Sequence, residues 1–133
     1  MVQIAGKYEL VDSKNFLKVL LSGGIPEDKA KLAENITTVL DVTIDGNKVR
    51  LQSDEKLNNH VTELILGQEV DEKFSSYTLK TIAKLDGNVI NVESKEDGKP
   101  TRTRIYRFTD SGLEIEYNSV KDNYTAKRVY KRI

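Results

Sequence analysis

The sequence predicts an all-β domain built from one strand, a pair of short helices and roughly nine further strands. Turn signals are the first observation: Asp-Gly-Asn occurs at residues 45–47 and 86–88, and Asp-Gly-Lys at 97–99. Between the turns, short segments alternate apolar and polar side chains, as half-buried strands do. Residues 15–34 show helical spacing instead, so helices form a minor part of the expected fold.

The helical region is expected directly after an opening strand, with Asp12 or Ser13 as the first N-cap. Phe16, Val19 and Leu20 form the apolar side of the first helix. Ser-Gly-Gly at 22–24 ends this helix, and Pro26 suits the first position of a second one. The pattern therefore predicts a helical hairpin between the first two strands.

The later strands follow one another closely enough to form an antiparallel meander. Their alternating apolar positions include Leu40, Val42, Ile44, Leu113, Ile115 and Tyr117. Further turn signals stand at 111–112 and 121–123. Two short helices cannot cover both faces of so much sheet, so the sheet is expected to close on itself.

The side chains expected to point inward are unusually polar for a solid core. This set is His60, Thr62, Glu72, Tyr117, Arg128 and Tyr130. Buried polar groups are costly unless they are hydrogen-bonded, and a partly hydrated cavity would tolerate them. A closed sheet of roughly ten strands leaves room for a small ligand.

The last strand, residues 124–131, supplies the most informative pair. Because successive side chains point to opposite faces, Arg128 and Tyr130 share one face, and the lysines at 127 and 131 lie on the other. A guanidinium beside a phenol forms a good receptor for a carboxylate in apolar surroundings, as in a carrier of an acidic lipid. The alternatives are an ion pair of Arg128 with Glu72 and a Tyr130 hydroxyl bonded to backbone.

Composition excludes several other classes. Lys plus Arg and Asp plus Glu number 21 each among 133 residues, and a neutral chain does not suit nucleic acid. The absence of cysteine excludes a disulfide scaffold and a thiol nucleophile. His60 is the single histidine, which disfavours a metal site and leaves no triad in view, so no enzyme is expected. Without a signal-peptide pattern or a long apolar run, a cytoplasmic protein is expected.

Four segments resemble the intracellular lipid-binding protein family, the fatty-acid-binding proteins. They are Gly-Lys-Tyr-Glu-Leu-Val-Asp-Ser-Lys-Asn-Phe at 6–16, Leu-Gly-Gln-Glu-Val-Asp-Glu at 66–72, Leu-Asp-Gly-Asn at 85–88 and Arg-Val-Tyr at 128–130. Their order and spacing extend the resemblance over essentially the whole chain. Lys-Pro-Thr at 99–101 and Phe-Thr-Asp at 108–110 favour an invertebrate member.

The resemblance implies a single domain over residues 1–133, a ten-stranded antiparallel up-and-down β-barrel with a helix-turn-helix lid at about 15–35. It also implies a carrier that binds a long-chain fatty acid reversibly, without a cofactor, its carboxylate held by Arg128 and Tyr130. A monomer is the simplest expectation. Carriage of a retinoid, sterol or bile acid is the alternative. An empty barrel that binds other proteins is a third possibility.

Further ligand contacts follow from the same resemblance. Phe16 and Leu20 would form the inner face of the lid, and Leu57 stands where the family has an aromatic residue at the barrel mouth. Ile115 and Tyr117 would line the cavity. The same side chains suit plain packing as well.

One strand departs from the family pattern. Where many members carry a second inward arginine, Tyr106 aligns, and Arg104 lies two residues before it. If the face with Arg104, Tyr106 and Phe108 points inward, as we expect, both residues are candidate ligand contacts. If the register slips, Arg104 lies on the surface. Tyr8 also replaces the family's usual tryptophan.

The helical region carries a group of lysines: Lys14, Lys18, Lys29 and Lys31. They suggest transient contact with anionic membranes during lipid transfer. The alternative is an ordinary solvated face, balanced by acidic residues at 27, 28 and 34.

Overall fold

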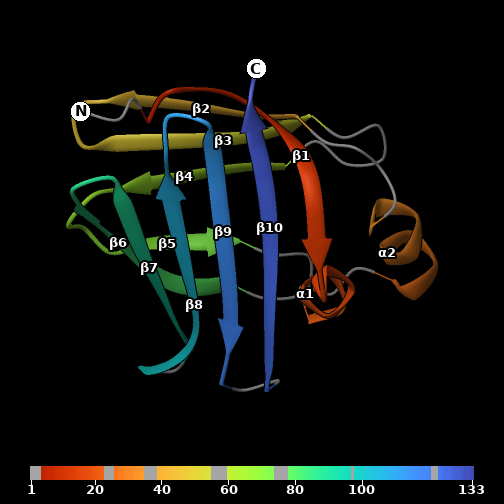
Figure 1. Ribbon diagram of the computed structural model, residues 1–133. Coiled ribbons are helices and arrows are strands. Elements are labelled where there is room, and N and C mark those ends of the chain that lie inside the picture. The colour runs from red at the N-terminus through yellow and green to blue at the C-terminus, as the bar shows by residue number, and fades with distance from the viewer. Residues whose placement is uncertain are drawn as a thin grey trace.

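The computed structural model describes residues 4–22, 26–34, 39–54, 60–73, 78–96, 98–120 and 123–133. Ten strands and two helices follow the expected order (Figure 1). The strands are β1 (Gly6–Lys14), β2 (Val39–Asp45), β3 (Lys48–Asp54), β4 (His60–Ile65), β5 (Val70–Lys73), β6 (Thr78–Asp86), β7 (Val89–Glu96), β8 (Lys99–Phe108), β9 (Gly112–Ser119) and β10 (Tyr124–Arg132). The helices are α1 (Phe16–Ser22) and α2 (Glu27–Glu34). The prediction of an all-β barrel is therefore confirmed.

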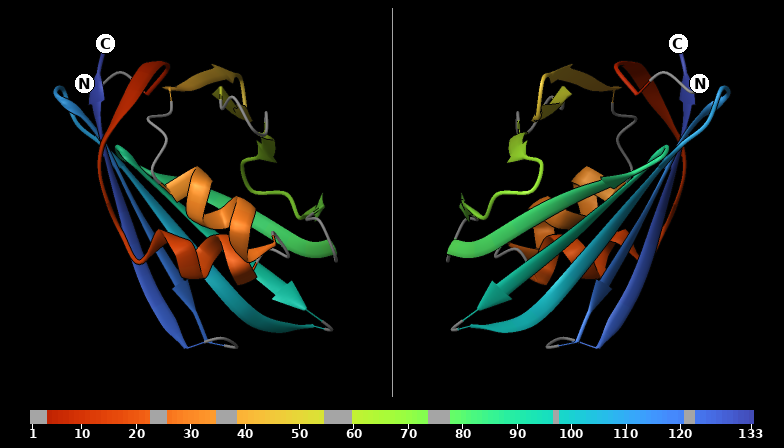
Figure 2. Two further views of the ribbon diagram at one scale, coloured as in Figure 1. Left: turned by 90° about the vertical axis from the view of Figure 1, so that its right-hand side faces the viewer. Right: turned by 90° about the vertical axis from the view of Figure 1, so that its left-hand side faces the viewer.

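All strands belong to one antiparallel sheet, and sequence neighbours pair throughout except between β4 and β5. The strand order is β4-β3-β2-β1-β10-β9-β8-β7-β6-β5. Pairing of β1 with β10 joins the two ends of the chain, and the amide of Ile133 donates to the carbonyl of Lys7 at 3.0 Å. Isolated bridges join Ile65 to Gln68 and Leu66 to Ala83 near the two end strands of this order. The sheet thus curls into a nearly closed barrel (Figure 2).

The turns predicted at 45–47 and 86–88 are tight hairpins. Gly46 and Gly87 have φ angles of 62° and 63°, a left-handed conformation that glycine adopts without the cost of a Cβ clash. β2 pairs with β3 up to Asp45 and Lys48, so only two residues form this turn. Such short turns leave consecutive strands side by side, which explains the meander.

The helices lie across one end of the barrel (Figure 2). The predicted N-caps are wrong, because Asp12 and Ser13 belong to β1, where Ser13 pairs with Arg128 of β10. The chain turns instead at Asn15, whose φ is 57° and whose Nδ2 donates to the carbonyl of Thr125 at 3.1 Å. Among the described residues, no helix is both long and apolar enough to cross a bilayer.

Tyr8 packs inside the barrel at the end where the termini meet. It is fully buried, its hydroxyl donates to the carbonyl of Ile4 at 2.7 Å, and its ring meets Phe108 edge-on at 5.9 Å. The guanidinium of Arg132 lies 4.8 Å from the same ring. Burial raises the pKa of the Tyr8 hydroxyl, although the charge of Arg132 opposes the shift. Tyr8 thus lies in the core without leaving its hydroxyl unbonded.

The alternating strands bury one face, as predicted, with an exception near a turn. Leu40 and Val42 are buried in β2, but Ile44 is 36% exposed. Ile44 lies two residues before the Gly46 turn and pairs with Val49, which is fully buried. The hydrophobic core lies between the strands and includes Val49, Leu51, Leu64, Ala83, Ile90, Val92, Phe108 and Leu113.

Candidate ligand-binding site

β10 turns Arg128 and Tyr130 into the barrel. Exposure alternates along the strand, and these side chains are 2% and 5% exposed, whereas Lys131 is exposed. Arg128 pairs across the sheet with Ser13 on β1 and Ile115 on β9, which fixes its position on the inner wall. The period-2 pattern of the sequence therefore identified the correct face of β10.

The Arg128 guanidinium makes contacts with neutral groups. Nε donates to Ser13 Oγ at 3.3 Å, and Nη1 donates to the Tyr130 hydroxyl at 3.4 Å. Its central carbon lies 3.4 Å from the centroid of the Phe16 ring, a stacked cation–π arrangement. Nη2 is buried and has no hydrogen-bond partner among the described residues. No ion pair of Arg128 is found within the described part of the chain, and a buried cation without a matching anion is costly, so this group is suited to receive one.

The second inward arginine, Arg104, lies on β8 together with Tyr106. Tyr106 and Phe108 are buried, whereas Arg107 faces outward and its Nη1 lies 3.3 Å from Glu114 Oε1. The preferred register of β8 is therefore the observed one. Arg104 pairs in the sheet with Tyr117 of β9, and Tyr106 pairs with Ile115.

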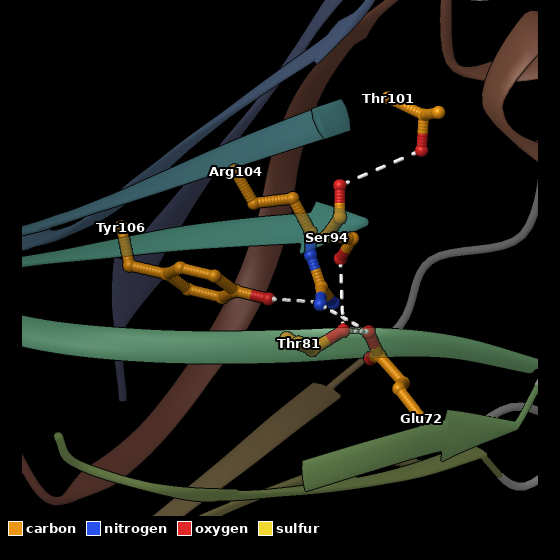
Figure 3. A network of polar contacts seen from close by, with 6 residues as sticks. All are labelled: Glu72, Thr81, Ser94, Thr101, Arg104 and Tyr106. Atoms are coloured by element: carbon orange, nitrogen blue, oxygen red, sulfur yellow. Dashed lines mark hydrogen bonds and ion pairs between the residues drawn. The ribbon is translucent and has the colours of Figure 1, made fainter. Parts of the chain in front are cut away.

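Arg104 belongs to a polar network with Glu72 (Figure 3). Its Nη2 lies 2.5 Å from Glu72 Oε1, and its Nη1 donates to the Tyr106 hydroxyl at 3.4 Å. Burial alone would lower the pKa of Arg104, but the charge and hydrogen bond of Glu72, together with smaller contributions from Tyr106 and Tyr117, raise that pKa. The carboxylate that the sequence offered as an alternative partner of Arg128 is thus bonded to Arg104.

Two hydroxyl residues complete this network and were not anticipated. Thr81 Oγ1 donates to Glu72 Oε1 at 3.0 Å, and Ser94 Oγ lies 2.9 Å from Thr81 Oγ1. Thr81 of β6 pairs with Ser94 of β7, so they are cross-strand neighbours on the inner face. Inward alternation could have indicated both, because Leu79 and Ala83 flank Thr81 at i±2 and Ser94 follows Ile90 and Val92 on the same face.

Phe16 of α1 and Tyr117 of β9 form a contact between the helical lid and the inner wall. Their rings meet edge-on with centroids 5.5 Å apart. Burial raises the pKa of Tyr117 well above 10.0, with further contributions from Tyr130 and Tyr106. Burial also raises the pKa of Tyr106, against the opposing charge of Arg104. These phenols are therefore neutral at physiological pH and can donate hydrogen bonds.

The structure describes only some of the remaining candidate ligand contacts. Leu57 lies outside the described residues, as do the side chains of Leu20 and His60. Ile115 is buried between Tyr106 and Arg128 in the same cross-strand row. Within the described ranges, no group of three or more His, Cys, Asp or Glu side chains converges as metal ligands would.

Known proteins resemble this chain over nearly its full length. "Fatty acid binding protein 1-B.1" of Danio rerio is 30% identical over 137 residues, covering 99% of this chain and 96% of its own. The fatty acid-binding protein of Tyrophagus putrescentiae is 27% identical over 133 residues, with 99% of each chain covered. No protein-family model matches the chain.

A solved structure of a fatty acid-binding protein from Drosophila melanogaster brain tissue superposes with a TM-score of 0.80. It is 29% identical and covers 94% of this chain and 95% of its own. Placement in an invertebrate branch stays a prediction, because the relatives include both vertebrate and invertebrate proteins. The shared sequence and the shared barrel show that this chain belongs to the fatty-acid-binding protein family, a family of carriers rather than enzymes.

Proposed function

We propose that the protein carries a long-chain fatty acid reversibly inside the barrel, with its carboxylate bound by Arg128 and Tyr130. The observation that supports this proposal most is the buried Nη2 of Arg128, which has no partner among the described residues. The Tyr130 hydroxyl accepts from Nη1, so its own hydrogen can be donated to the same carboxylate. Together these groups offer two donors to one anionic headgroup.

The two parts of the ligand would contribute differently to affinity. Burial of the tail contributes up to about 0.8 kcal/mol per methylene, so a long chain supplies most of the gross affinity. A hydrogen bond to a charged group contributes about 1.5–3 kcal/mol. Association and ordering costs remove a large part of that sum. Arg128 is therefore expected to set the choice and orientation of the headgroup more than the total affinity.

Calorimetric titration of delipidated protein with oleate and with oleyl alcohol tests the proposal. We expect Arg128→Ala to weaken oleate binding by about 1–3 kcal/mol, because the carboxylate loses its cation. Binding of the alcohol, which has no charge to match, is expected to change far less.

Arg107→Ala is the matched control, since Arg107 lies on the outer face of β8 in an exposed ion pair. It is expected to leave both affinities unchanged. If Arg128→Ala binds oleate as tightly as the wild type does, Arg128 does not hold the carboxylate. If the wild type fails to bind oleate, the carrier proposal itself is wrong.

A further inference from the structure

A second buried polar group inside the barrel has the opposite chemistry to Arg128. The Glu72 side chain is 7% exposed, and its Oε2 is buried without a hydrogen-bond partner among the described residues. Arg128 Nη2 is a buried donor without an acceptor among the described residues, whereas Glu72 Oε2 is a buried acceptor without a donor among them. A buried polar atom that stays unbonded is costly, so a ligand that bonds it gains affinity.

The positions of the donors in the network show that none of its own members donates a hydrogen bond to Glu72 Oε2. Thr81 has one hydroxyl hydrogen and donates it to Glu72 Oε1, so Ser94 must donate to Thr81. Arg104 Nη2 also donates to Oε1. Both neighbouring donors thus converge on one carboxylate oxygen and leave the other available (Figure 3).

The charge of this network determines what kind of group it can accept. Arg104 and Glu72 form an ion pair, so the pair is close to neutral as a unit. A second carboxylate would meet the repulsion of Glu72 beside the attraction of Arg104. A hydroxyl meets no such repulsion and supplies the donor that Oε2 requires.

Arg128 and the Glu72–Arg104 pair lie on one continuous inner wall of the barrel. Tyr106, Ile115 and Arg128 occupy one cross-strand row over β8, β9 and β10. Two strand spacings place the backbones of Tyr106 and Arg128 about 10 Å apart. Arg104 is two residues from Tyr106 on the same strand and bonds to its hydroxyl. One lipid chain whose carboxylate meets Arg128 can therefore pass the Glu72–Arg104 pair along its length.

We propose that the Glu72–Arg104 pair is a second polar subsite that binds a hydroxyl on the lipid chain, so that the protein favours hydroxylated over plain fatty acids. This inference rests on the proposed fatty acid carriage and adds the chemical class of the preferred ligand. A site built around an unbonded acceptor discriminates against a ligand that lacks the matching donor.

Matched lipid pairs test the subsite. Titrations would compare oleate with ricinoleate, which differ by one hydroxyl, and stearate with hydroxystearates substituted at successive positions. We expect at least one hydroxylated member to bind about tenfold more tightly than its plain counterpart, as a hydrogen bond to a charged group gives.

The double variant Glu72→Leu, Arg104→Met removes the subsite and replaces a buried ion pair by apolar groups, which proteins often tolerate. It is expected to bind oleate still and to lose the hydroxyl preference. Asp71→Asn is the control, because Asp71 is on the same strand but faces outward in an exposed pair with Lys80. It should keep the preference.

A single variant gives an independent readout. Glu72→Gln keeps the side-chain shape but removes the charge that matches Arg104, so a long-chain dicarboxylate should bind more tightly relative to oleate. If oleate binds but no hydroxylated member is preferred, or the preference survives the double variant, this inference is wrong and the carrier proposal stands. If oleate fails to bind the wild type, the carrier proposal fails first.

Discussion

Arg104 and Arg128 both point into the barrel, yet their charges meet different surroundings. Arg104 lies in an ion pair with Glu72, whereas Arg128 contacts two hydroxyls and the face of Phe16. An aromatic face and neutral hydroxyls stabilise a cation less than a carboxylate does. Arg128 is consequently the better anion receptor, and Arg104 is already matched.

Tyr130→Phe tests the second member of the receptor. The substitution removes one hydroxyl donor, and we expect oleate binding to weaken by about 0.5–1.5 kcal/mol, less than for Arg128→Ala. Titration calorimetry measures the change. Tyr124→Phe is the matched control on the same face of β10 and should bind oleate normally; an equal loss in both variants would contradict a specific role for Tyr130.

The face of the sheet on which each inward side chain lies was predictable from the sequence, but the residues that each side chain contacts were not. Alternation placed Arg128 and Tyr130 inward correctly, because the period of a strand fixes the face. It left Glu72 open as a partner for Arg128, since pattern alone gives no distance across several strands. Asp12 or Ser13 was expected to cap a helix, but Ser13 pairs with Arg128 in the sheet, and its Oγ accepts a hydrogen bond from Arg128 Nε.

At the scale of elements, the lid and the inner wall meet at the proposed headgroup site. α1 supplies Phe16, which stacks on Arg128 of β10 and meets Tyr117 of β9 edge-on. A ligand carboxylate that binds Arg128 must therefore lie beside the first residue of the lid. This arrangement links lid position to headgroup binding through one aromatic ring.

The basic side of the lid region gives a prediction about lipid transfer. Lys14 and Lys18 are exposed, as are Lys29 and Lys31, although Lys31 is 3.1 Å from Glu27. We expect Lys14→Glu, Lys18→Glu to slow transfer of a fluorescent fatty acid to anionic vesicles at low salt, because attraction to the surface is lost. The difference should shrink at high salt.

Neutral vesicles serve as the control for this transfer assay, since they offer no charge to the lysines. Transfer to them should be the same for the variant and the wild type. Equal rates to anionic vesicles at low salt would contradict membrane contact through the lid region and favour release into water.

The order of strands and helices was largely predictable, because short-range sequence signals mark the turns and the helical segment. Gly-containing turns at 45–47 and 86–88 bound the strands, and helical spacing marked 15–34. The N-cap of the first helix was misplaced because β1 continues through Lys14, held by its pairing with β10. Long-range pairing, which local pattern does not contain, decides such boundaries.

At the scale of the whole molecule, closure of the barrel places residues from distant parts of the chain on one wall. β1 and β10 pair, so Ser13 and Arg128 become neighbours although they stand 115 residues apart. The nearly closed sheet gives the inward side chains a common interior. The sequence predicted closure from the excess of sheet over helix, but not that β4 and β5 would be the unpaired neighbours.

Alkaline pH is expected to destabilise the fold through its buried phenols. Burial raises the pKa of Tyr8, Tyr106 and Tyr117 above the ordinary value of 10.0. Well below pH 10 both folded and unfolded phenols are protonated, so they add no pH dependence. Above it the unfolded chain releases these protons first, and stability falls as pH rises toward the folded pKa values.

Thermal unfolding followed by circular dichroism measures this effect across the alkaline range. Tyr117→Phe removes one of the titrating groups, so the midpoint of the variant should fall less steeply above pH 10 than that of the wild type. A midpoint that stays level or rises in the wild type would contradict the proposed burial of ionisable phenols.

Native mass spectrometry of the purified protein, followed by lipid analysis under denaturing conditions, shows which lipid the barrel carries. We expect a long-chain fatty acid bound to the chain, with hydroxylated species over-represented relative to the host's free fatty acids. The delipidated protein should gain thermal stability when oleate is added, because the ligand binds the folded state. An empty protein that gains no stability from oleate would contradict fatty acid carriage.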